Sequence, residues 1–395
     1  MPDAAARRRA GRGTILLLAA IAALGSLATQ LLVPALPQLA RELHTGPGDA
    51  QLVISLFLVG LGGGQLLTGP LADRLGRKPV LLAGLALYCL GSLAAALAPS
   101  LPLLLAARVI QALGGASGVV VARVLVGDLF PPEETAGRQA TLMAVVLISP
   151  ALAPVLGGAL SEVAGWRALF GGLALAGLAG MALAATSLPE APGRSAAPPA
   201  ARLADALGDL LRNARFVGPV LAIAGGSSAL YMFLGNAPFL LAHDYHLRPR
   251  EVGAAMMVIA AASIAATFLV ARIERRGDAL LTGTALGLTG GLLLLGGALA
   301  GLHGLAAFIG PMTLLGLGAG MIGPAGITRV LRAMPGREGT SAALAGATQM
   351  LGSALAAFAL SRFAPVDLVR LGLGIALACA LSLGGTLLGR TAARR

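Results

Sequence analysis

Long apolar runs alternate with short polar stretches along almost the whole chain. A helix needs about 20 apolar residues to cross the hydrocarbon layer of a bilayer. Backbone groups in lipid must form hydrogen bonds within the segment, and the alternation of barrel strands does not occur, so we predict an all-α membrane protein. We expect twelve helices, at about residues 14–36, 50–72, 79–98, 101–127, 138–161, 166–188, 216–241, 251–272, 279–300, 304–328, 340–362 and 367–388.

The longest polar stretch, residues 189–213, separates the sixth predicted helix from the seventh. It contains three prolines and then, at 202–212, leucines at helical spacing, which together indicate a linker with a short amphipathic helix on the membrane surface. We therefore expect an N-terminal six-helix half at residues 1–188, a cytoplasmic linker at 189–215 and a C-terminal six-helix half at 216–395.

Composition agrees with a membrane protein, because 57% hydrophobic and only 12% charged residues cannot cover a soluble globule with a polar surface. In a soluble protein the net charge of +12 would suggest a nucleic-acid partner. With the N-terminus in the cytoplasm, however, most Lys and Arg residues fall at inner loops, tails and helix ends, as the positive-inside rule expects. We therefore expect a lipid bilayer around the chain, both termini in the cytoplasm and no nucleic-acid partner.

The sequence offers no pattern typical of an enzyme. Cys89 and Cys379 lie inside apolar runs of opposite halves, so we interpret them as small core residues. We find no His and Asp set at metal-ligand spacing and no nucleophile with catalytic partners. We expect neither an enzyme nor a cofactor or metal site.

The densest charge between two apolar runs is Gly-Pro-Leu-Ala-Asp-Arg-Leu-Gly-Arg-Lys-Pro at 69–79. Charges are disfavoured in hydrocarbon, so this segment should form a surface loop between the second and third helices. Arg74, Arg77 and Lys78 could serve only as cytoplasmic anchors. That alternative does not explain Asp73 or the paired glycines.

Two further patterns lie within predicted helices. Arg108 interrupts the fourth helix, where a charge costs about 2.5–3.5 kcal/mol on the insertion scale and is a functional candidate. It could instead extend towards the outer surface, but we favour the bundle interior and a role in proton coupling or helix positioning. The fifth helix contains Ser-Pro-Ala-Leu-Ala-Pro-Val-Leu-Gly-Gly at 149–158, which could also serve ordinary helix packing.

The loop at 69–78 resembles the signature loop of major facilitator superfamily transporters. Arg-Val-Ile-Gln-Ala-Leu-Gly-Gly at 108–115 resembles a second signature, and 149–158 resembles the antiporter motif of drug exporters, with Ala153 replacing its first glycine. Nearly the whole chain is similar to the bicyclomycin-resistance and chloramphenicol-efflux (Bcr/CflA) group of bacterial drug:proton antiporters. The further residues that carry this similarity are 33–37, Gln65, 123–130, 165–167 and 236–239.

The resemblance implies multidrug or small-molecule efflux by alternating access, with protons as the coupling ion and a monomer in the bacterial inner membrane. It also implies two pseudo-symmetric halves with a substrate path between them. An internal repeat agrees with this, because Asp-Arg-Leu-Gly at 73–76 recurs as Glu-Arg-Arg-Gly at 274–277, which is 201 residues later.

The resemblance assigns gating or conformational roles to charged residues, glycines and prolines. Asp73 would latch onto the start of the eleventh helix, near 339–341, where a helix N-terminus favours an anion. Arg77 would pair with Asp128, while the loop glycines would permit close approach and a tight turn. The full set is Gly69, Asp73, Arg74, Gly76, Arg77, Asp128, Pro150, Pro154, Gly157 and Gly158.

One position departs from the Bcr/CflA pattern, since Thr29 and Gln30 stand where that group has a Thr-Asp pair. A proton-coupled exporter needs a titratable group facing its cavity, and glutamine does not titrate. Three alternatives stay open: coupling through Asp128, Asp73 or Glu162, coupling through the substrate's own proton, or a facilitator without a coupling ion. Other ionisable candidates lie at outer helix ends and more often face solvent: Asp49, Asp244, His243 and His246.

The substrate site should lie between the halves near the bilayer midplane. Without an acidic residue there, neutral or weakly anionic molecules are favoured over cationic drugs, although an amino-acid or sugar exporter would use the same fold. Polar side chains in membrane helices also form interhelical hydrogen bonds, and methionines are often core residues. The candidates are Gln30, Gln65, Arg108, Gln111, Tyr231, Asn236 and Gln349, with Phe233, Met256 and Met257 as adaptable apolar surface.

Overall fold

The computed structural model describes residues 11–189, 212–333, 338–363 and 366–394. Within these ranges the chain is helical almost throughout, as its apolar runs predict. The elements are α2 (Arg12–Gln30), the 3-10 helix η1 (Val33–Ala35), α3 (Leu36–Glu42), α4 (Pro47–Leu75), α5 (Arg77–Ala96), α6 (Leu101–Leu129), α7 (Pro132–Ser187), α9 (Ala214–His243), α10 (Pro249–Glu274), α11 (Ala279–Leu299), α12 (Leu305–Ala333), α13 (Glu338–Ser361) and α14 (Leu368–Arg394).

The described residues contain 11 helices that are long and apolar enough to cross a membrane. The difference from the expected twelve lies in α7, which contains both the fifth and the sixth predicted helices. Gly165 separates these two, because its backbone angles (φ 79°, ψ 166°) lie outside the helical region and are readily adopted only by glycine.

Two compact units divide the chain. The first contains residues 1–39 and 56–197, and the second contains residues 40–55 and 198–395. The start of α4 is thus grouped with the second unit, which the sequence did not predict. The expected linker and its amphipathic helix lie almost entirely outside the described residues, so the domain boundaries stay predictions.

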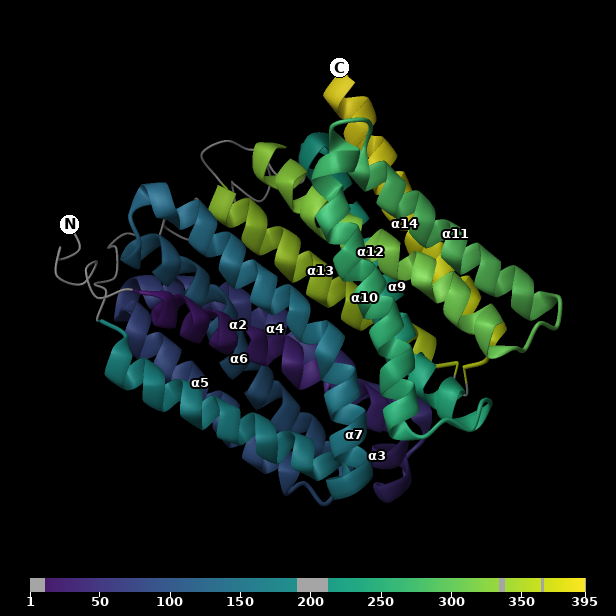
Figure 1. Ribbon diagram of the computed structural model, residues 1–395, viewed down its shortest axis with the longest axis horizontal. Helices are drawn as coiled ribbons and strands as arrows, with labels where there is room; N and C mark the ends of the chain where they lie inside the picture. The colour runs from purple at the N-terminus through teal and green to yellow at the C-terminus, as the bar shows by residue number, and fades with distance from the viewer. Residues whose placement is uncertain (1–10, 190–211, 334–337, 364–365, 395) are drawn as a thin grey trace. The chain divides into compact units, whose positions relative to one another are not determined.

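Glycines let the helices of the first unit approach closely. α5 and α6 lie side by side (Figure 1). A Cβ atom at Gly114 would overlap the backbone nitrogen of Tyr88, and one at Gly91 would overlap that of Gln111. Lipid provides no hydrophobic effect between helices, so close backbone packing of this kind is a main source of their association.

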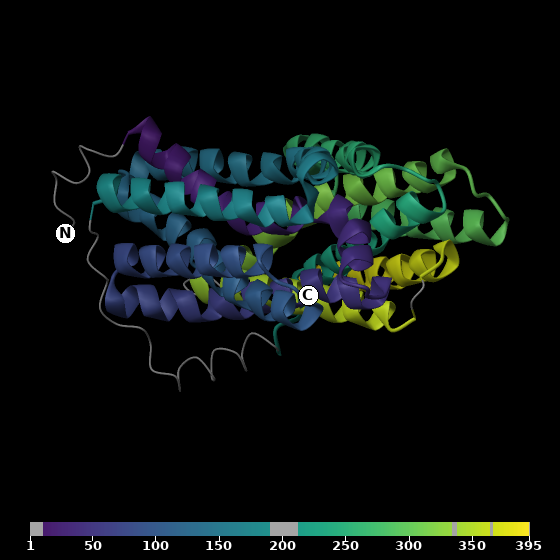
Figure 2. The same ribbon diagram turned by 90° about the horizontal axis from the view of Figure 1, so that it is seen from below.

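The second unit is packed in the same manner. A Cβ atom at Gly218 of α9 would lie 2.7 Å from the carbonyl oxygen of Gly385 in α14, so only small residues fit at this contact. Figure 2 shows the green and yellow helices of this unit running alongside one another. A buried apolar cluster joins α9, α11 and α12, and its larger members are Phe216, Val220, Ile223, Leu280, Ile322 and Val330.

Large apolar side chains cover the outer faces of the helices. Leu90, Leu175 and Leu377 are 61%, 69% and 64% exposed, although each lies well inside a long helix. Such a surface is unfavourable in water and favourable in hydrocarbon. The distribution of apolar side chains therefore agrees with a chain that lies in a membrane.

Candidate functional site

Arg108 in α6 is completely buried in the first unit. Its Nη1 donates to the carbonyl oxygen of Ala28 at 3.2 Å and to Oε1 of Gln111. Its guanidinium carbon lies 3.9 Å from the centre of the Phe57 ring and 5.6 Å from that of Phe170, so two aromatic rings stabilise the cation. The predicted interior orientation is confirmed, and the alternative of an arginine reaching the outer surface is wrong.

Hydrogen bonds continue from Arg108 into α5. Nε2 of Gln111 donates to the hydroxyl oxygen of Ser92 at 2.8 Å, and Ser92 donates to the carbonyl oxygen of Tyr88 at 2.7 Å. The Tyr88 hydroxyl donates to the carbonyl oxygen of Leu24 at 3.0 Å. This buried chain of hydrogen bonds joins α2, α5 and α6, and losing one member would leave others unsatisfied.

The same packing affects the predicted substrate contacts of the first unit. Arg108 and Gln111 are 0% exposed and bind each other, so neither reaches a substrate in this conformation. Gln30 is 8% exposed and Gln65 is half-buried, and neither side chain forms a hydrogen bond with another described residue. A role of these two glutamines in ligand binding therefore stays a prediction.

The predicted polar residues of the second unit form two separate contacts. Nδ2 of Asn236 donates to the carbonyl oxygen of Met232 at 2.8 Å, while its Oδ1 accepts a hydrogen bond from Gln51, which belongs to the same unit. Nε2 of Gln349 donates to the hydroxyl of Ser227 at 2.9 Å. In this conformation both side chains act as interhelical hydrogen-bonding groups.

Aromatic and methionine candidates of this unit differ in exposure. Phe233 and Met256 are buried, and the Phe233 ring lies 6.0 Å from that of Phe308, which agrees with the alternative of core residues. Tyr231 is half-buried, and Met257 is 37% exposed. Only the last two present surface to a ligand among these four side chains.

Arg77 organises the charged loop of the first unit. Its Nη1 lies 2.8 Å from the Asp73 carboxylate and donates to the carbonyl oxygen of Ala72 at 2.8 Å. Its Nε lies 3.3 Å from Asp128 at the end of α6. The ion pair with Asp128 that the resemblance implied is therefore present, and we call Asp73, Arg77 and Asp128 the first clamp.

The neighbouring residues position this loop. Gly76 has a φ of 95°, which forms the expected tight turn between α4 and α5. Lys78 donates to the carbonyl oxygens of Ala185 and Leu188, at 2.8 and 2.7 Å, and so neutralises the end of α7. A Cβ atom at Gly69 would meet no atom within 4 Å, and the close approach expected there stays a prediction.

The proline and glycine motif lies within α7. A Cβ atom at Gly157 would overlap the carbonyl oxygen of Leu31, so this glycine allows α7 to contact the chain directly after α2. Pro154 and Gly158 are buried, and the side chain of Pro150 is outside the described part. This contact agrees with helix packing, and an antiport role for the motif stays a prediction.

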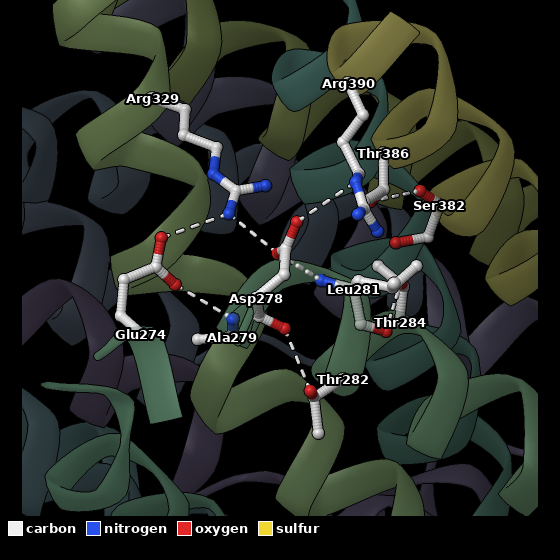
Figure 3. A network of polar contacts seen from close by, with 10 residues as sticks. All are labelled: Glu274, Asp278, Ala279, Leu281, Thr282, Thr284, Arg329, Ser382, Thr386 and Arg390. Atoms are coloured by element: carbon white, nitrogen blue, oxygen red, sulfur yellow. Dashed lines mark hydrogen bonds and ion pairs between the residues drawn. The ribbon is translucent and has the colours of Figure 1, made fainter. Parts of the chain in front are cut away.

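A second cluster of charges lies where α10 and α12 end and α11 begins (Figure 3). Nη2 of Arg329 donates to Asp278 at 2.7 Å and to Glu274 at 3.1 Å, and Nε of Arg390 lies 3.5 Å from Asp278. Burial alone would raise the pKa of Asp278, but hydrogen bonds from Arg329 and the Leu281 amide, with the charges of both arginines, lower it overall. We call Glu274, Asp278 and Arg329 the second clamp.

The second clamp repeats the first with its charges exchanged. Arg77 and Asp128 are 51 positions apart, as are Asp278 and Arg329. Each member of the second pair lies 201 positions after its counterpart, with acid and base reversed. The repeat of residues 73–76 at 274–277 predicted Glu274 as the counterpart of Asp73, but it did not predict the ion pair between Asp278 and Arg329. Adding 201 to the positions of Arg77 and Asp128 leads directly to this pair.

The other ionisable candidates lie at helix ends. Asp49 and Glu162 are exposed, and Nδ1 of His243 lies 2.9 Å from the Asp244 carboxylate at an exposed position. Among the residues that the structure describes, no group of three or more His, Cys, Asp or Glu side chains could hold a metal ion. In each of the two clamps, one arginine lies at ion-pair distance from two carboxylates.

Comparison with known proteins gives consistent relatives. The sequence profile described as Major Facilitator Superfamily matches residues 18–357. Multidrug resistance protein D of Escherichia coli (strain K12) is 33% identical over 228 residues, which cover 58% of this chain and 57% of that protein. The chloramphenicol resistance protein of Pseudomonas aeruginosa is 38% identical over 181 residues, 45% of this chain and 42% of the relative. The aligned regions therefore span less than two thirds of these relatives.

Solved structures share the fold at low sequence identity. A crystal structure of a D-xylose-proton symporter has a TM-score of 0.74 at 15% identity, covering 94% of this chain and 97% of that one. The xylose transporter XylE from E. coli, in an inward-open conformation, has a TM-score of 0.70 at 16% identity, covering 93% and 95%. With the helical architecture and a profile match over most of its length, this multi-pass membrane protein belongs to the Major Facilitator Superfamily.

Proposed function

We propose that this protein exports small drug-like molecules across the bacterial inner membrane by alternating access, in exchange for protons. The observation that carries the proposal is the pair of clamps, which occupy matched positions in two units of one chain. Movement of internal repeats is the basis of alternating access in secondary transporters. Ion pairs that form in one state and open in another would bias this movement.

The proposed direction of transport, which is export, and the proposed substrate class rest on sequence features. Two relatives are named multidrug and chloramphenicol resistance proteins, and residues 149–158 resemble the antiporter motif of drug exporters. The amides of Gln30 and Gln65 are uncharged, and acidic residues in the sequence fall near helix ends. These features support a neutral or weakly anionic substrate.

Proton coupling is assigned to the first clamp, since Gln30 cannot titrate. Asp73 and Asp128 both bind Arg77, so protonation of either carboxylate would weaken the clamp, and re-forming it would release the proton. Gln30 also favours a second candidate function, a facilitator of the same substrates that uses no coupling ion.

Topology and assembly belong to the same proposal. Both termini face the cytoplasm, because the arginine-rich ends of the helices then obey the positive-inside rule. The protein acts as a monomer in the bilayer, since one chain contains both repeats. In the second unit these ends carry Arg215, Arg275, Arg276, Arg332 and Arg390.

Transport in proteoliposomes tests the proposal. Wild type, Asp128→Asn and Gln30→Asp would be compared over a small antibiotic panel, with a pH-sensitive dye in the lumen. We expect drug movement to alkalinise the compartment that receives the drug in wild type, and Asp128→Asn to lose this signal. Flux without proton movement in wild type, with coupling only in Gln30→Asp, would establish the facilitator. Absence of flux across the panel would contradict drug export.

A further inference from the structure

A pocket with a volume of about 410 Å³ lies in the second unit, where α9 and α11 begin and α12 and α14 end. Four arginines and one carboxylate contribute to its wall. Neither substrate transport nor the second clamp requires a cavity here, so the pocket needs its own explanation. Its lining is Arg215, Pro219, Asp278, Leu280, Arg329, Arg332, Ala333, Thr386, Gly389 and Arg390.

The inner wall of the pocket is held in place by the second clamp. Asp278 lies between Arg329 and Arg390, as Figure 3 shows, and Arg329 also binds Glu274. Ion pairs with Asp278 position Arg329 and Arg390, whose side chains remain 25% and 34% exposed and line the pocket. The guanidinium groups of Arg329 and Arg390 are therefore already positioned to donate hydrogen bonds to an anion in the pocket.

The outer wall carries positive charge that the clamp does not neutralise. Arg215 and Arg332 are exposed, and Nε of Arg215 donates to the carbonyl oxygen of Ala392 at 3.1 Å. Among the residues whose side chains the structure describes, no carboxylate lies at ion-pair distance from Arg215 or Arg332. Four guanidinium groups therefore converge on a volume beside which the described side chains include two carboxylates, Asp278 and Glu274.

A phosphate group has the chemistry that this pocket would recognise. Guanidinium groups bind phosphate oxygens through paired, charge-assisted hydrogen bonds, and several can share one dianion. The volume exceeds that of a bare phosphate, and the apolar lining by Pro219, Leu280 and Ala333 suits a short carbon chain beside it. We propose that the pocket binds a phosphate ester, supplied by an anionic phospholipid headgroup or by a soluble phosphomonoester.

Binding would add a further connection between the ends of three helices of the second unit. A phosphate in the pocket would contact the first turn of α9 through Arg215 and the last turns of α12 and α14 through Arg332 and Arg390. A ligand that binds the folded protein raises its unfolding temperature in proportion to the logarithm of ligand concentration. The proposal therefore predicts that phosphate esters raise the unfolding temperature increasingly as their concentration exceeds the dissociation constant.

The test compares two double variants, each of which removes two positive charges from the same end of the second unit. Arg215→Gln/Arg332→Gln alters the pocket, whereas Arg275→Gln/Arg276→Gln alters exposed arginines outside its lining. Full-length protein in phospholipid-free detergent at fixed ionic strength would be titrated with sn-glycerol 3-phosphate and inorganic phosphate. A second arm would measure retention of phosphatidylglycerol against phosphatidylcholine by native mass spectrometry.

We expect saturable binding of at least one probe to wild type, weakened about tenfold or more in the pocket variant and less than about threefold in the control. Preferential phosphatidylglycerol retention without glycerol phosphate binding identifies a lipid headgroup, and the reverse identifies a soluble ester. Binding of no probe to wild type, or equal weakening in both variants, would overturn the proposal. If the double variant does not fold, Arg332→Gln compared with Arg276→Gln makes the same distinction.

Discussion

At the scale of single residues, Arg108 contributes geometry as well as charge. Its guanidinium binds Gln111 and Ala28 while it stacks on Phe57. Lysine keeps the charge but has neither the planar fork nor the stacking face. Arg108→Lys should therefore reduce the free energy of unfolding by roughly 1.5–3 kcal/mol and reduce export. Thermal unfolding in detergent and drug accumulation in cells would measure the two effects.

The control for this change is Arg138→Gln. Arg138 pairs with Glu134 at 3.0 Å near the surface and also lies 5.0 Å from the centre of the Phe130 ring, and such a surface ion pair contributes about 0–1 kcal/mol. Equal destabilisation by the two variants would show that complete burial gives Arg108 no special role.

The lowered pKa of Asp278 predicts how the stability of the protein depends on pH. Its pKa is lowered in the folded protein, so the carboxylate stabilises the fold above the ordinary pKa of 3.8, and this contribution is lost as the pH falls through the lowered value. Wild type should therefore lose thermal stability more steeply than Asp278→Asn below about pH 4. Parallel slopes for the two proteins in thermal unfolding at several pH values would refute this assignment.

Sequence reasoning located Arg108 correctly because a charge inside an apolar run has few ways to avoid lipid. It did not identify Phe57, Phe170 or Ser92 as partners, because helix rotation and close glycine contacts decide which side chains face one another. The same limit explains why Gln111, predicted as a substrate contact, is instead bound to the arginine.

At the scale of helices, the two clamps make a charge-exchange experiment possible. Arg77→Asp alone would bring three carboxylates together, and Asp128→Arg alone would place two arginines side by side. Both changes together would reproduce the second clamp, in which one arginine on the later helix binds two carboxylates. We expect each single variant to lose about tenfold or more in export, and the double variant to recover to within about threefold of wild type.

Export rates and folded yield would both be measured for this series. A double variant no better than the worse single variant would mean that the polarity of the first clamp is fixed by its surroundings. Asp73→Glu, which makes the third position match Glu274, serves as the control and should retain export.

The fifth-helix motif offers a separate prediction within α7. Gly157→Ala places a methyl group against the Leu31 carbonyl and should destabilise the fold by about 1–3 kcal/mol. Gly172→Ala in the same helix meets no atom within 4 Å and should be neutral or slightly stabilising. Loss of export in a stable Gly157→Ala protein would instead favour a direct role of the motif in transport.

The helices themselves were largely predictable, since length and hydropathy define spans in lipid. The break at Gly165 was expected as a boundary between two spans, and its positive φ shows why glycine occupies that position. The ion pair between Asp278 and Arg329 was missed because sequence repeats are recognised by similar residues at matching positions. In this pair the acid and the base have exchanged positions, so only the interaction between them is the same as in the first clamp.

At the scale of the whole molecule, pseudo-symmetry was predictable from one tetrapeptide repeat, and the grouping of residues 40–55 with the second unit was not. Helix contacts of α9 with the start of α4, such as Asn236 with Gln51, have no periodic signal in the sequence. Substrate choice belongs to this scale as well, because it depends on the summed charge that the transport path presents to a ligand.

Substrate charge therefore gives the last prediction. Gln30 and Gln65 offer uncharged amides, and the acidic residues with defined partners are held in ion pairs at helix ends. Acidic residues in the sequence fall near the ends of the apolar runs, so a cation at the middle of a span would lack a carboxylate to offset its desolvation, whereas a neutral molecule loses little. A neutral phenicol antibiotic should thus be exported better than a quaternary ammonium dye in a pump-deficient strain, and Gln30→Asp should shift the preference towards the dye. The reverse ranking in wild type would contradict the assignment.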